Sequence, residues 1–217
     1  MKQANITIID FGMGNIQSVR NALERIGCLV QVSSDPREIY TADALVLPGV
    51  GAFGEAMNNL TCKKLIKPLK NAVVDEGKPI LGICLGMQLL ADDSDERGGH
   101  KGLSLISGHV KKIPVTENLL LPHIGWNDLL VKKSEPLFNK ISDGDAFYFV
   151  HSHHFECETN YISATTDYGV YITASIQKER IFAVQFHPER SQRKGLILLK
   201  NFVNYVEETI SKSTILC

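Results

Sequence analysis

The stretch Pro79-Ile80-Leu81-Gly82-Ile83-Cys84-Leu85-Gly86-Met87-Gln88 decides the fold of this chain. An apolar run of strand length leads into Gly82-x-Cys84-x-Gly86, and apolar side chains then recur at helical spacing. The pattern is typical of a nucleophile elbow, with cysteine where serine is more common. Glycine is needed on both sides of the nucleophile because flanking β-carbons would collide where the backbone reverses. The segment alone leaves one alternative open, a buried small residue at an ordinary strand-to-helix turn.

Before this segment, short apolar runs alternate with stretches of helical periodicity. Strands are predicted at 6–10, 28–32, 44–47 and 79–84, and helices at 16–26 and, interrupted near Pro68, at about 62–76. Strands that alternate with helices are typical of βαβ units, which form a parallel sheet covered on both faces. We therefore predict an α/β fold.

After about residue 102, strand-like runs follow one another without long helices between them. They lie at 107–113, 129–131, 146–150, 162–165, 170–176 and 181–186, and helical spacing returns over 193–210. These runs predict an antiparallel or mixed extension of the same core. Because no linker separates the two halves, we expect residues 1–217 to form a single domain.

Charge and cysteine usage exclude several classes of protein. With 23 basic and 24 acidic side chains, the chain lacks the positive charge typical of proteins that bind nucleic acids or acidic membranes. Its five cysteines have irregular spacing and no Cys-x-x-Cys pair, so we expect neither a disulfide scaffold nor a zinc site. Neither a signal peptide nor an apolar stretch of transmembrane length is evident, which favours a cytoplasmic location. The near-zero net charge favours a small molecule or a protein as the partner.

A nucleophilic cysteine needs a base, and Phe186-His187-Pro188-Glu189 supplies the best candidate. His187 ends an apolar strand, and Glu189 lies two residues on, a spacing that keeps both side chains on one side of an extended backbone. Proline between them should hold that backbone extended. We predict His187 as the general base and Glu189 as the carboxylate that orients it, although His-Pro-Glu in isolation is also common in solvated turns.

A glycine-flanked segment directly follows the predicted strand at 44–47. Gly49-Val50-Gly51 allows a ligand to approach the backbone closely, so its amides are candidate donors to an oxyanion. A plain tight turn or a phosphate-binding loop remains an alternative for this segment.

Taken together, these motifs resemble the class I, triad-type glutamine amidotransferases. The resemblance runs nearly end to end and is carried by residues 10–16, 48–53, 82–90, 122–127, 148–152 and 185–189. The elbow and His-Pro-Glu identify the superfamily. Pro-His-Ile-Gly-Trp-Asn at 122–127 and Phe-Val-His-Ser at 149–152 narrow the resemblance to the glutaminase subunits of imidazole glycerol phosphate synthases.

This resemblance implies a three-layer, flavodoxin-like fold and hydrolysis of L-glutamine through a thioester on Cys84, without a cofactor. It assigns proton transfer to His187 and its support to Glu189, the oxyanion strand to Gly49–Gly51, and a substrate contact to Gln88. It also implies a heterodimer in which ammonia passes to a (β/α)₈-barrel synthase subunit. That subunit then makes imidazole glycerol phosphate and AICAR in histidine biosynthesis.

The resemblance also places Asn15, Trp126, His153 and Arg190 near the partner interface. Two of them depart from the family pattern, since tyrosine is usual at the position of His153 and lysine is common at that of Arg190. These departures leave open a related glutaminase that supplies a sugar amidotransferase of surface-polysaccharide synthesis. A non-catalytic subunit that binds a partner, and a cysteine hydrolase with another substrate such as a peptide, are further alternatives.

Three other features have simpler interpretations. His151 and His153 would share a strand face, but too few further ligands stand nearby for a metal site. Trp126, between glycine and asparagine in a loop-like segment, fits either a core or an interface position. The charged stretch 92–97 is expected to be a solvated loop.

Overall fold

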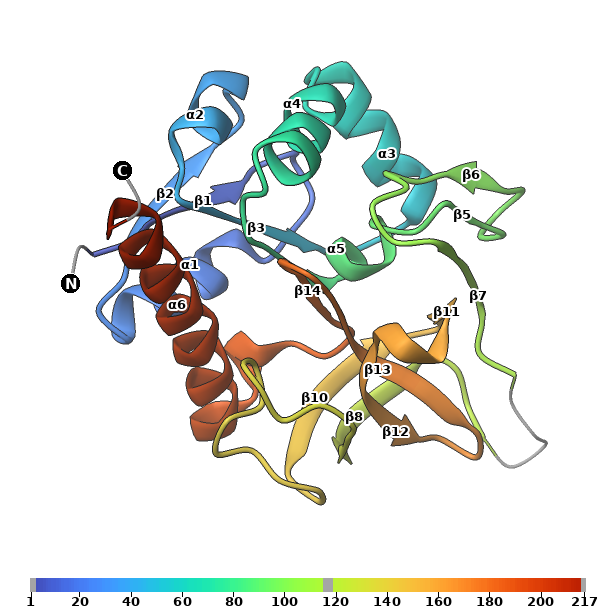
Figure 1. The fold of residues 1–217 in the computed structure, drawn as a ribbon. Coiled ribbons are helices and arrows are strands. Elements are labelled where there is room, and N and C mark those ends of the chain that lie inside the picture. The colour runs from blue at the N-terminus through green and yellow to red at the C-terminus, as the bar shows by residue number, and fades with distance from the viewer. Residues whose placement is uncertain (1–2, 115–118, 216–217) are drawn as a thin grey trace.

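The computed structural model of the chain describes residues 3–114 and 119–215, with side chains described up to Lys212. Its largest sheet contains, in spatial order, β2 (Leu29–Ser33), β1 (Asn5–Ile9), β3 (Ala44–Gly49), β4 (Ile80–Cys84), β14 (Ile181–Val184), β13 (Tyr171–Lys178), β12 (Ile162–Asp167) and β9 (Leu130–Val131) (Figure 1). The strands from β2 to β14 are parallel, and β13, β12 and β9 extend the sheet with antiparallel pairing. The parallel strands follow the order of flavodoxin-like folds. The predicted α/β fold with an antiparallel extension is confirmed.

Two smaller sheets complete the strands that the structure describes. The first pairs β8 (His123–Asp128) with β10 (Ala146–His151), and we call this pair the ribbon. The second contains β11 (His153–Cys157), β7 (Gly108–Lys112), β5 (Asp93–Ser94) and β6 (His100–Lys101). Both lie toward the carboxyl ends of the parallel strands, because β10 and β11 pass close to Cys84 and Gln88.

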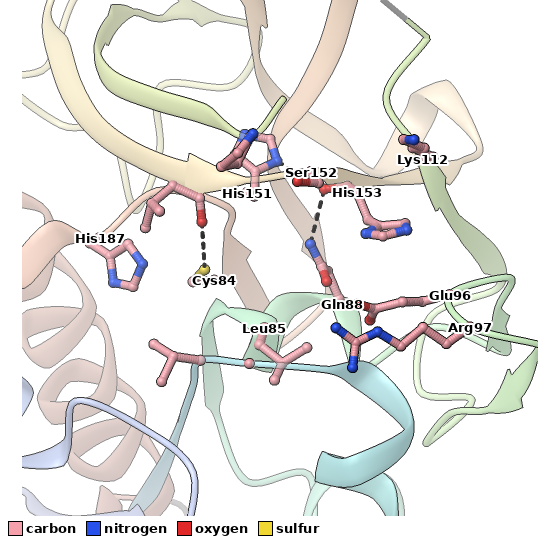
Figure 2. Close-up of a pocket in the computed structure, with 14 residues that line it drawn as sticks. Cys84, Leu85, Gln88, Glu96, Arg97, Lys112, His151, Ser152, His153 and His187 are labelled. Carbon is pink, nitrogen blue, oxygen red and sulfur yellow. Dashed lines mark hydrogen bonds between the residues drawn. The ribbon is translucent and has the colours of Figure 1, made fainter. Parts of the chain in front are cut away.

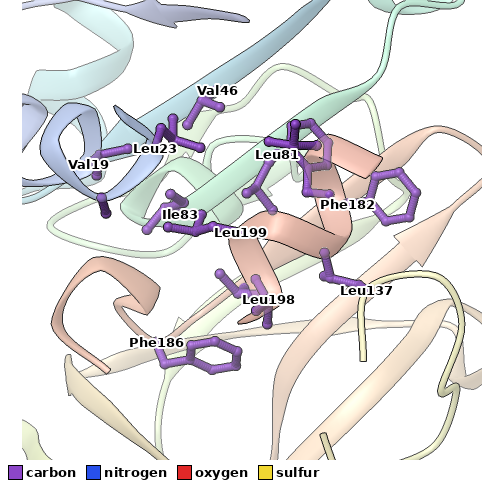
Figure 3. Packing of buried hydrophobic residues seen from close by; sticks show 14 of the residues in the cluster. Val19, Leu23, Val46, Leu81, Ile83, Leu137, Phe182, Phe186, Leu198 and Leu199 are labelled. Carbon is purple, nitrogen blue, oxygen red and sulfur yellow. The ribbon is translucent and has the colours of Figure 1, made fainter. Parts of the chain in front are cut away.

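Helices cover both faces of the large sheet (Figure 1). One face carries α1 (Ile16–Arg25) and α6 (Gln192–Ile215), and the other carries α2 (Pro36–Thr41), α3 (Phe53–Cys62) and α4 (Ile66–Lys70). Alternate residues of β3 show the two layers: Ala44 and Val46 pack with α1 and α6, whereas Leu45 and Leu47 pack with α2, α3 and α4. Figure 3 shows the first of these clusters, where Leu199 lies against the sheet.

The structure corrects the helix predicted near Pro68 and the setting predicted for Trp126. The helix predicted at about 62–76 does not break at Pro68, which lies in the first turn of α4, where a missing N–H is tolerated. The break comes earlier, at Lys64 with φ of 56°, and separates α3 from α4 and the π-helical turn Asn71–Asp75. Trp126 lies on a strand rather than in a loop, since β8 pairs with β10. Among the described residues, no helix is long and apolar enough to cross a membrane.

Candidate active site

Cys84 is the last residue of β4, and α5 (Leu85–Gln88) begins immediately after it. Its backbone has φ of 55° and ψ of −111°, a conformation that is rare outside glycine and costs on the order of 1–3 kcal/mol. Such a conformation persists only where the surrounding structure holds it in place. The thiol therefore projects from a strained strand-to-helix turn at the carboxyl edge of the parallel sheet.

Gly82 and Gly86 hold this turn by close backbone packing. A β-carbon on Gly86 would lie 1.7 Å from the carbonyl oxygen of Leu47, and one on Gly82 would lie 2.8 Å from the carbonyl oxygen of Gly86. The contact at Gly82 lies within the reversing backbone, as the motif predicts, whereas the contact at Gly86 shows that the helix after Cys84 rests directly on β3. No other residue type fits at position 86 without moving the backbone.

The register of the sheet brings His187 to the same edge. Because β14 pairs in parallel with β4, Ala183 lies beside Gly82 and Val184 beside Ile83, and both strands end together. Figure 2 shows the imidazole of His187 next to the sulfur of Cys84. The Nδ1 atom of His187 lies 2.8 Å from Oε1 of Glu189, and these side chains are only 3% and 1% exposed.

The backbone that brings Glu189 to His187 differs from the predicted one. Pro188–Arg190 form a 3₁₀ turn rather than an extended segment. The backbone N–H of His187 donates to the carbonyl of Tyr148 at 2.9 Å, and Ser191 Oγ donates to the carbonyl of His187 at 2.6 Å. These bonds fix the turn against β10, so a tight turn, not an extended backbone, brings the carboxylate to the imidazole.

Charge at the site favours a protonated His187. Burial disfavours the imidazolium, but the neighbouring Cys84 and Glu189 outweigh burial and raise the pKa of His187 to about 10. Its Nε2 atom has no hydrogen-bond partner within the described residues, although it is buried. The sulfur of Cys84 lies 3.9 Å from the carbonyl oxygen of Val150 and 3.8 Å from Nε2 of Gln185. The Val150 carbonyl accepts from the thiol and the Gln185 amide donates to the sulfur, so the side chain of Cys84 lies between an acceptor and a donor beside the imidazole of His187.

Cys84 opens into a cavity of about 530 Å³, a volume suited to a small molecule (Figure 2). Its walls come from the elbow, the end of β3, the ribbon and the charged stretch after the elbow. They comprise Val50, Gly51, Cys84, Leu85, Gln88, Glu96, Arg97, Lys112, Pro122, Val150, His151, Ser152, His153 and His187.

Gln88 is buried at one end of this cavity, and its amide orientation is fixed. Its Nε2 donates to the carbonyl oxygen of His153 at 3.0 Å and to Oε1 of Gln185 at 2.9 Å. Both N–H bonds are used, which leaves Oε1 of Gln88 as an acceptor for a ligand.

The end of β3 lies beside the thiol. Gly49 is the register partner of Cys84 across the sheet, and a β-carbon on Gly49 would lie 3.0 Å from Cβ of Leu85. Val50 and Gly51 line the cavity, and Gly51 has a φ of 103° that favours glycine. The structure thus brings the three predicted oxyanion residues to the nucleophile.

Glu96 and Arg97 are pocket residues that the sequence prediction missed. The stretch 92–97 is only partly a solvated loop: Asp95 and Arg97 are exposed, but Asp93 and Ser94 form β5, and Glu96 and Arg97 line the cavity. Glu96 also accepts a hydrogen bond from the backbone N–H of Phe53 at 2.8 Å, at the start of α3. A carboxylate is favourable at a helix N-terminus. The available signal was the position of these charges directly after the elbow helix.

Comparison with known proteins agrees with this geometry. A sequence model of the family "Glutamine amidotransferase class-I" matches residues 7–205. The chain belongs to this family. It is 48% identical to imidazole glycerol phosphate synthase subunit HisH 1 of Campylobacter jejuni subsp. jejuni serotype O:23/36 (strain 81-176), over 91% of this chain and 98% of that protein. It is also 48% identical to the HisH subunit of Moorella thermoacetica, over 91% of this chain and 93% of that protein.

Solved structures support the fold. A putative GMP synthase subunit from Thermoplasma acidophilum superposes with a TM-score of 0.76 at 19% identity, covering 99% of both chains. PurLQS from Thermotoga maritima gives a TM-score of 0.72 at 17% identity, covering 94% of this chain and all of the matched chain.

In this class I glutamine amidotransferase, Trp126 and Arg190, two of the four predicted interface residues, both contact the ring of Tyr148. The ring of Tyr148 lies 6.2 Å from that of Trp126 and carries the Arg190 guanidinium 4.7 Å above it. His153 lies elsewhere, on the cavity wall, where its carbonyl binds Gln88. Asn15 directly precedes α1 without a side-chain capping hydrogen bond, and α1 packs against the turn that carries Arg190.

The histidines do not form the predicted common face. His151 ends β10 and His153 begins β11, in a different sheet, so the prediction that they share a strand face is wrong. Across the described part of the amidotransferase chain, no three His, Cys, Asp or Glu side chains are grouped to hold a metal ion.

Burial raises the pKa of the Cys28 and Cys157 thiols to about 11, which makes them poor nucleophiles.

Proposed function

We propose that this chain is the glutaminase subunit of an imidazole glycerol phosphate synthase, and that Cys84, His187 and Glu189 are its catalytic triad. The observation that carries the proposal is the strained Cys84 facing a buried, carboxylate-bound His187 at the wall of a small cavity. The high identity to HisH subunits over nearly the whole chain supports the choice of pathway.

Chemistry begins with attack of the Cys84 thiolate on the side-chain amide carbon of L-glutamine. His187 donates its proton to the departing nitrogen, which leaves as ammonia, and a glutamyl thioester remains on Cys84. His187 is then neutral and takes a proton from water, which attacks the thioester and releases glutamate. Glu189 keeps Nδ1 of His187 protonated and oriented throughout. Backbone amides at Gly49–Gly51 and the N-terminus of α5 stabilise the oxyanion.

The opposite charges on the cavity wall suit the amino-acid end of glutamine. Glu96 and the free Oε1 of Gln88 offer acceptors to the substrate ammonium, while Arg97 and Lys112 offer cations to its carboxylate. A zwitterion would thus be held at its charged end, with its amide directed toward Cys84.

The exposed face of the ribbon is the proposed contact for the (β/α)₈-barrel subunit. Ile124 and Trp126 are 58% and 48% exposed on alternate positions of β8, and their register partners on β10 are Val150 and Tyr148. Exposed apolar clusters of this kind mark interaction sites. Val150 also lines the cavity, so a partner on this face would lie next to the point where ammonia is released.

Glutamate release by the assembled complex tests the proposal. Cys84→Ala should lower the rate by at least about 10³-fold, whereas Cys62→Ala, which removes an exposed thiol, should leave it unchanged. Activity that survives Cys84→Ala would exclude the proposed nucleophile. A reactive glutamine analogue should label Cys84, and failure to label it would favour the non-catalytic subunit. Product analysis with free glutamine distinguishes a glutaminase from a peptidase.

A sugar amidotransferase remains the second candidate for the ammonia acceptor, because His153 and Arg190 depart from the family pattern near the interface. Assembly and glutaminase activation should be measured with each partner in turn. Activation by the imidazole-forming barrel supports the histidine pathway, and activation only by the sugar enzyme contradicts it.

A further inference from the structure

Two buried imidazoles connect the ribbon to the glutamine cavity. His123 begins β8 and His151 ends β10, and they are register partners. The Nδ1 atom of His123 lies 3.0 Å from Nε2 of His151, and Nδ1 of His151 lies 2.8 Å from the carbonyl oxygen of His153. At the other end, Nδ2 of Asn127 lies 3.2 Å from Nε2 of His123.

The hydrogen-bond partners at the two ends of this pair of imidazoles determine which ring nitrogens carry protons. The carbonyl of His153 can only accept, so Nδ1 of His151 carries a proton and its Nε2 is an acceptor. His123 must therefore donate from Nδ1, which leaves its Nε2 to accept from the Asn127 amide. Each imidazole has one compatible neutral tautomer, and a second proton on either ring would place two donors face to face.

The same carbonyl joins the imidazoles to the substrate pocket. The carbonyl oxygen of His153 accepts from both His151 and Gln88, which occupies its two lone pairs. Gln88 donates its second N–H to Oε1 of Gln185, and Nε2 of Gln185 lies 3.8 Å from the sulfur of Cys84. Figure 2 shows Gln88 extended toward this carbonyl beneath His151.

Burial supports the neutral form of both rings. It lowers the pKa of His151 to about 3 and that of His123 to about 4. His154, only three residues from His151, is also buried, but neither of its ring nitrogens has a hydrogen-bond partner in the described part of the chain. A histidine can thus be buried in this region without hydrogen-bonded ring nitrogens. His151 differs from His154 because it donates to the carbonyl that also binds Gln88.

We propose that His151, oriented by His123, is a positioning residue for glutamine binding, because its N–H fixes the His153 carbonyl that holds the amide of Gln88. The inference rests on the proposed glutaminase function and adds a residue pair that does not touch the reacting atoms. Loss of the N–H frees the carbonyl and with it the orientation of Gln88. Glutamine affinity should fall while the triad keeps its geometry.

The test compares His151→Leu with His151→Asn in the assembled complex. The two side chains have nearly the same shape, but only asparagine retains an N–H at the position of histidine Nδ1. We expect His151→Leu to raise the KM for glutamine by about tenfold and to change kcat by less than about threefold, the cost of one hydrogen bond in a buried site. His151→Asn should keep KM within about threefold of the native value.

His154→Leu is the matched control, and its KM should equal the native value. Alkylation of Cys84 by iodoacetamide, read by mass spectrometry, reports on the thiol without glutamine and should proceed at the same rate in all variants. If the position 151 variants do not assemble, His123→Leu and His123→Asn provide the same comparison one step along the chain, since asparagine retains the donor to Nε2 of His151.

Each result distinguishes between the two proposals. A native complex without glutaminase activity would refute the proposed function. An active native complex in which His151→Leu leaves KM unchanged, or in which His151→Asn and His151→Leu raise KM equally, would refute the positioning role alone. A tenfold rise with leucine that asparagine restores supports it.

Discussion

The elbow and the ribbon both border the same cavity, but they are stabilised in different ways. Around Cys84 the backbone of α5 packs on that of β3 so closely that Gly86 cannot carry a β-carbon. The ribbon has only two strands, an arrangement that is marginally stable alone. Its inner side packs Phe147 and Phe149 against Phe186 of the core, and His123 stacks on Phe149 at 4.8 Å and on Tyr168 at 4.0 Å.

The two regions therefore have different expected roles: the elbow holds the nucleophile, and the ribbon links the proposed partner surface to the cavity. The elbow needs nothing from outside the chain to hold its strained cysteine. The ribbon exposes Ile124 and Trp126 on one side. On the other side, the hydrogen-bonded pair His123 and His151 connects it to the cavity. We therefore expect changes at the elbow to act on folding and on the chemical step, and changes in the ribbon to act on partner binding and glutamine affinity.

The largest effect should come from the elbow. Gly86→Ala places a methyl group 1.7 Å from a backbone oxygen, so we expect a loss of more than about 4 kcal/mol of stability or no folded protein. Thermal unfolding measures it. Gly144→Ala is the control, since its β-carbon would meet nothing within 4 Å and only its φ of 84° is unfavourable, at a cost of about 1 kcal/mol. Equal losses in the two variants would show that the elbow is not tightly packed.

Trp126→Ala should separate the ribbon from the elbow. Because the indole is about half exposed, its removal should weaken partner binding by about ten- to a hundredfold and leave the unfolding temperature nearly unchanged. Calorimetric titration with the barrel subunit measures the Kd. Tyr40→Ala, an exposed aromatic on α2 in a different layer, should not change it. A Kd that Trp126→Ala leaves unaltered would remove this face from the proposed interface.

Acid should affect the ribbon through its histidines. The unfolded chain takes up a proton on each histidine near pH 6.5, whereas burial lowers the pKa of His151 to about 3 and that of His123 to about 4. Their contribution to stability is thus complete above pH 6.5 and is lost as pH falls toward these values. Below pH 6 each contributes a slope of about 1.4 kcal/mol per pH unit.

His151→Asn should remove one such contribution, so its free energy of unfolding should fall less steeply between pH 6 and about 4 than that of the native chain. Urea unfolding at several pH values measures both slopes. Identical slopes would mean that His151 is not held neutral in the folded protein.

The smallest effect is expected at His154. Neither ring nitrogen has a partner in the described residues, so His154→Leu removes the cost of burying unpaired polar atoms. Stability should rise, or change by less than about 1 kcal/mol, in the same unfolding assay. A loss of several kcal/mol would indicate a hydrogen-bond partner such as an ordered water.

The elbow could be predicted from the sequence because its determinants are local. Gly82, Cys84 and Gly86 lie within five residues, and steric exclusion dictates their spacing. The parallel sheet around them follows from alternating apolar runs and helical stretches in the same way.

The sequence predicts the strand at 146–150, but not its pairing with β8, because the two strands are distant in the sequence. Trp126 faces Tyr148, 22 residues along the chain, and Gly125 interrupts the alternation that signals a strand. The role of Glu96 was also hidden, since its binding to the backbone of Phe53 depends on a contact across 43 residues. Charge runs appear solvated in a sequence unless the fold brings a donor to them.

The position of β14 has a consequence for how the protein is made. This strand pairs with β4 although about a hundred residues separate them, and the intervening strands emerge from the ribosome first. Until residues 181–184 are synthesised, β4 lacks its neighbour on that side, and its exposed edge invites pairing with other chains. The thiol of Cys84 is therefore made 103 residues before its histidine, and the growing chain lacks a complete active site over that interval.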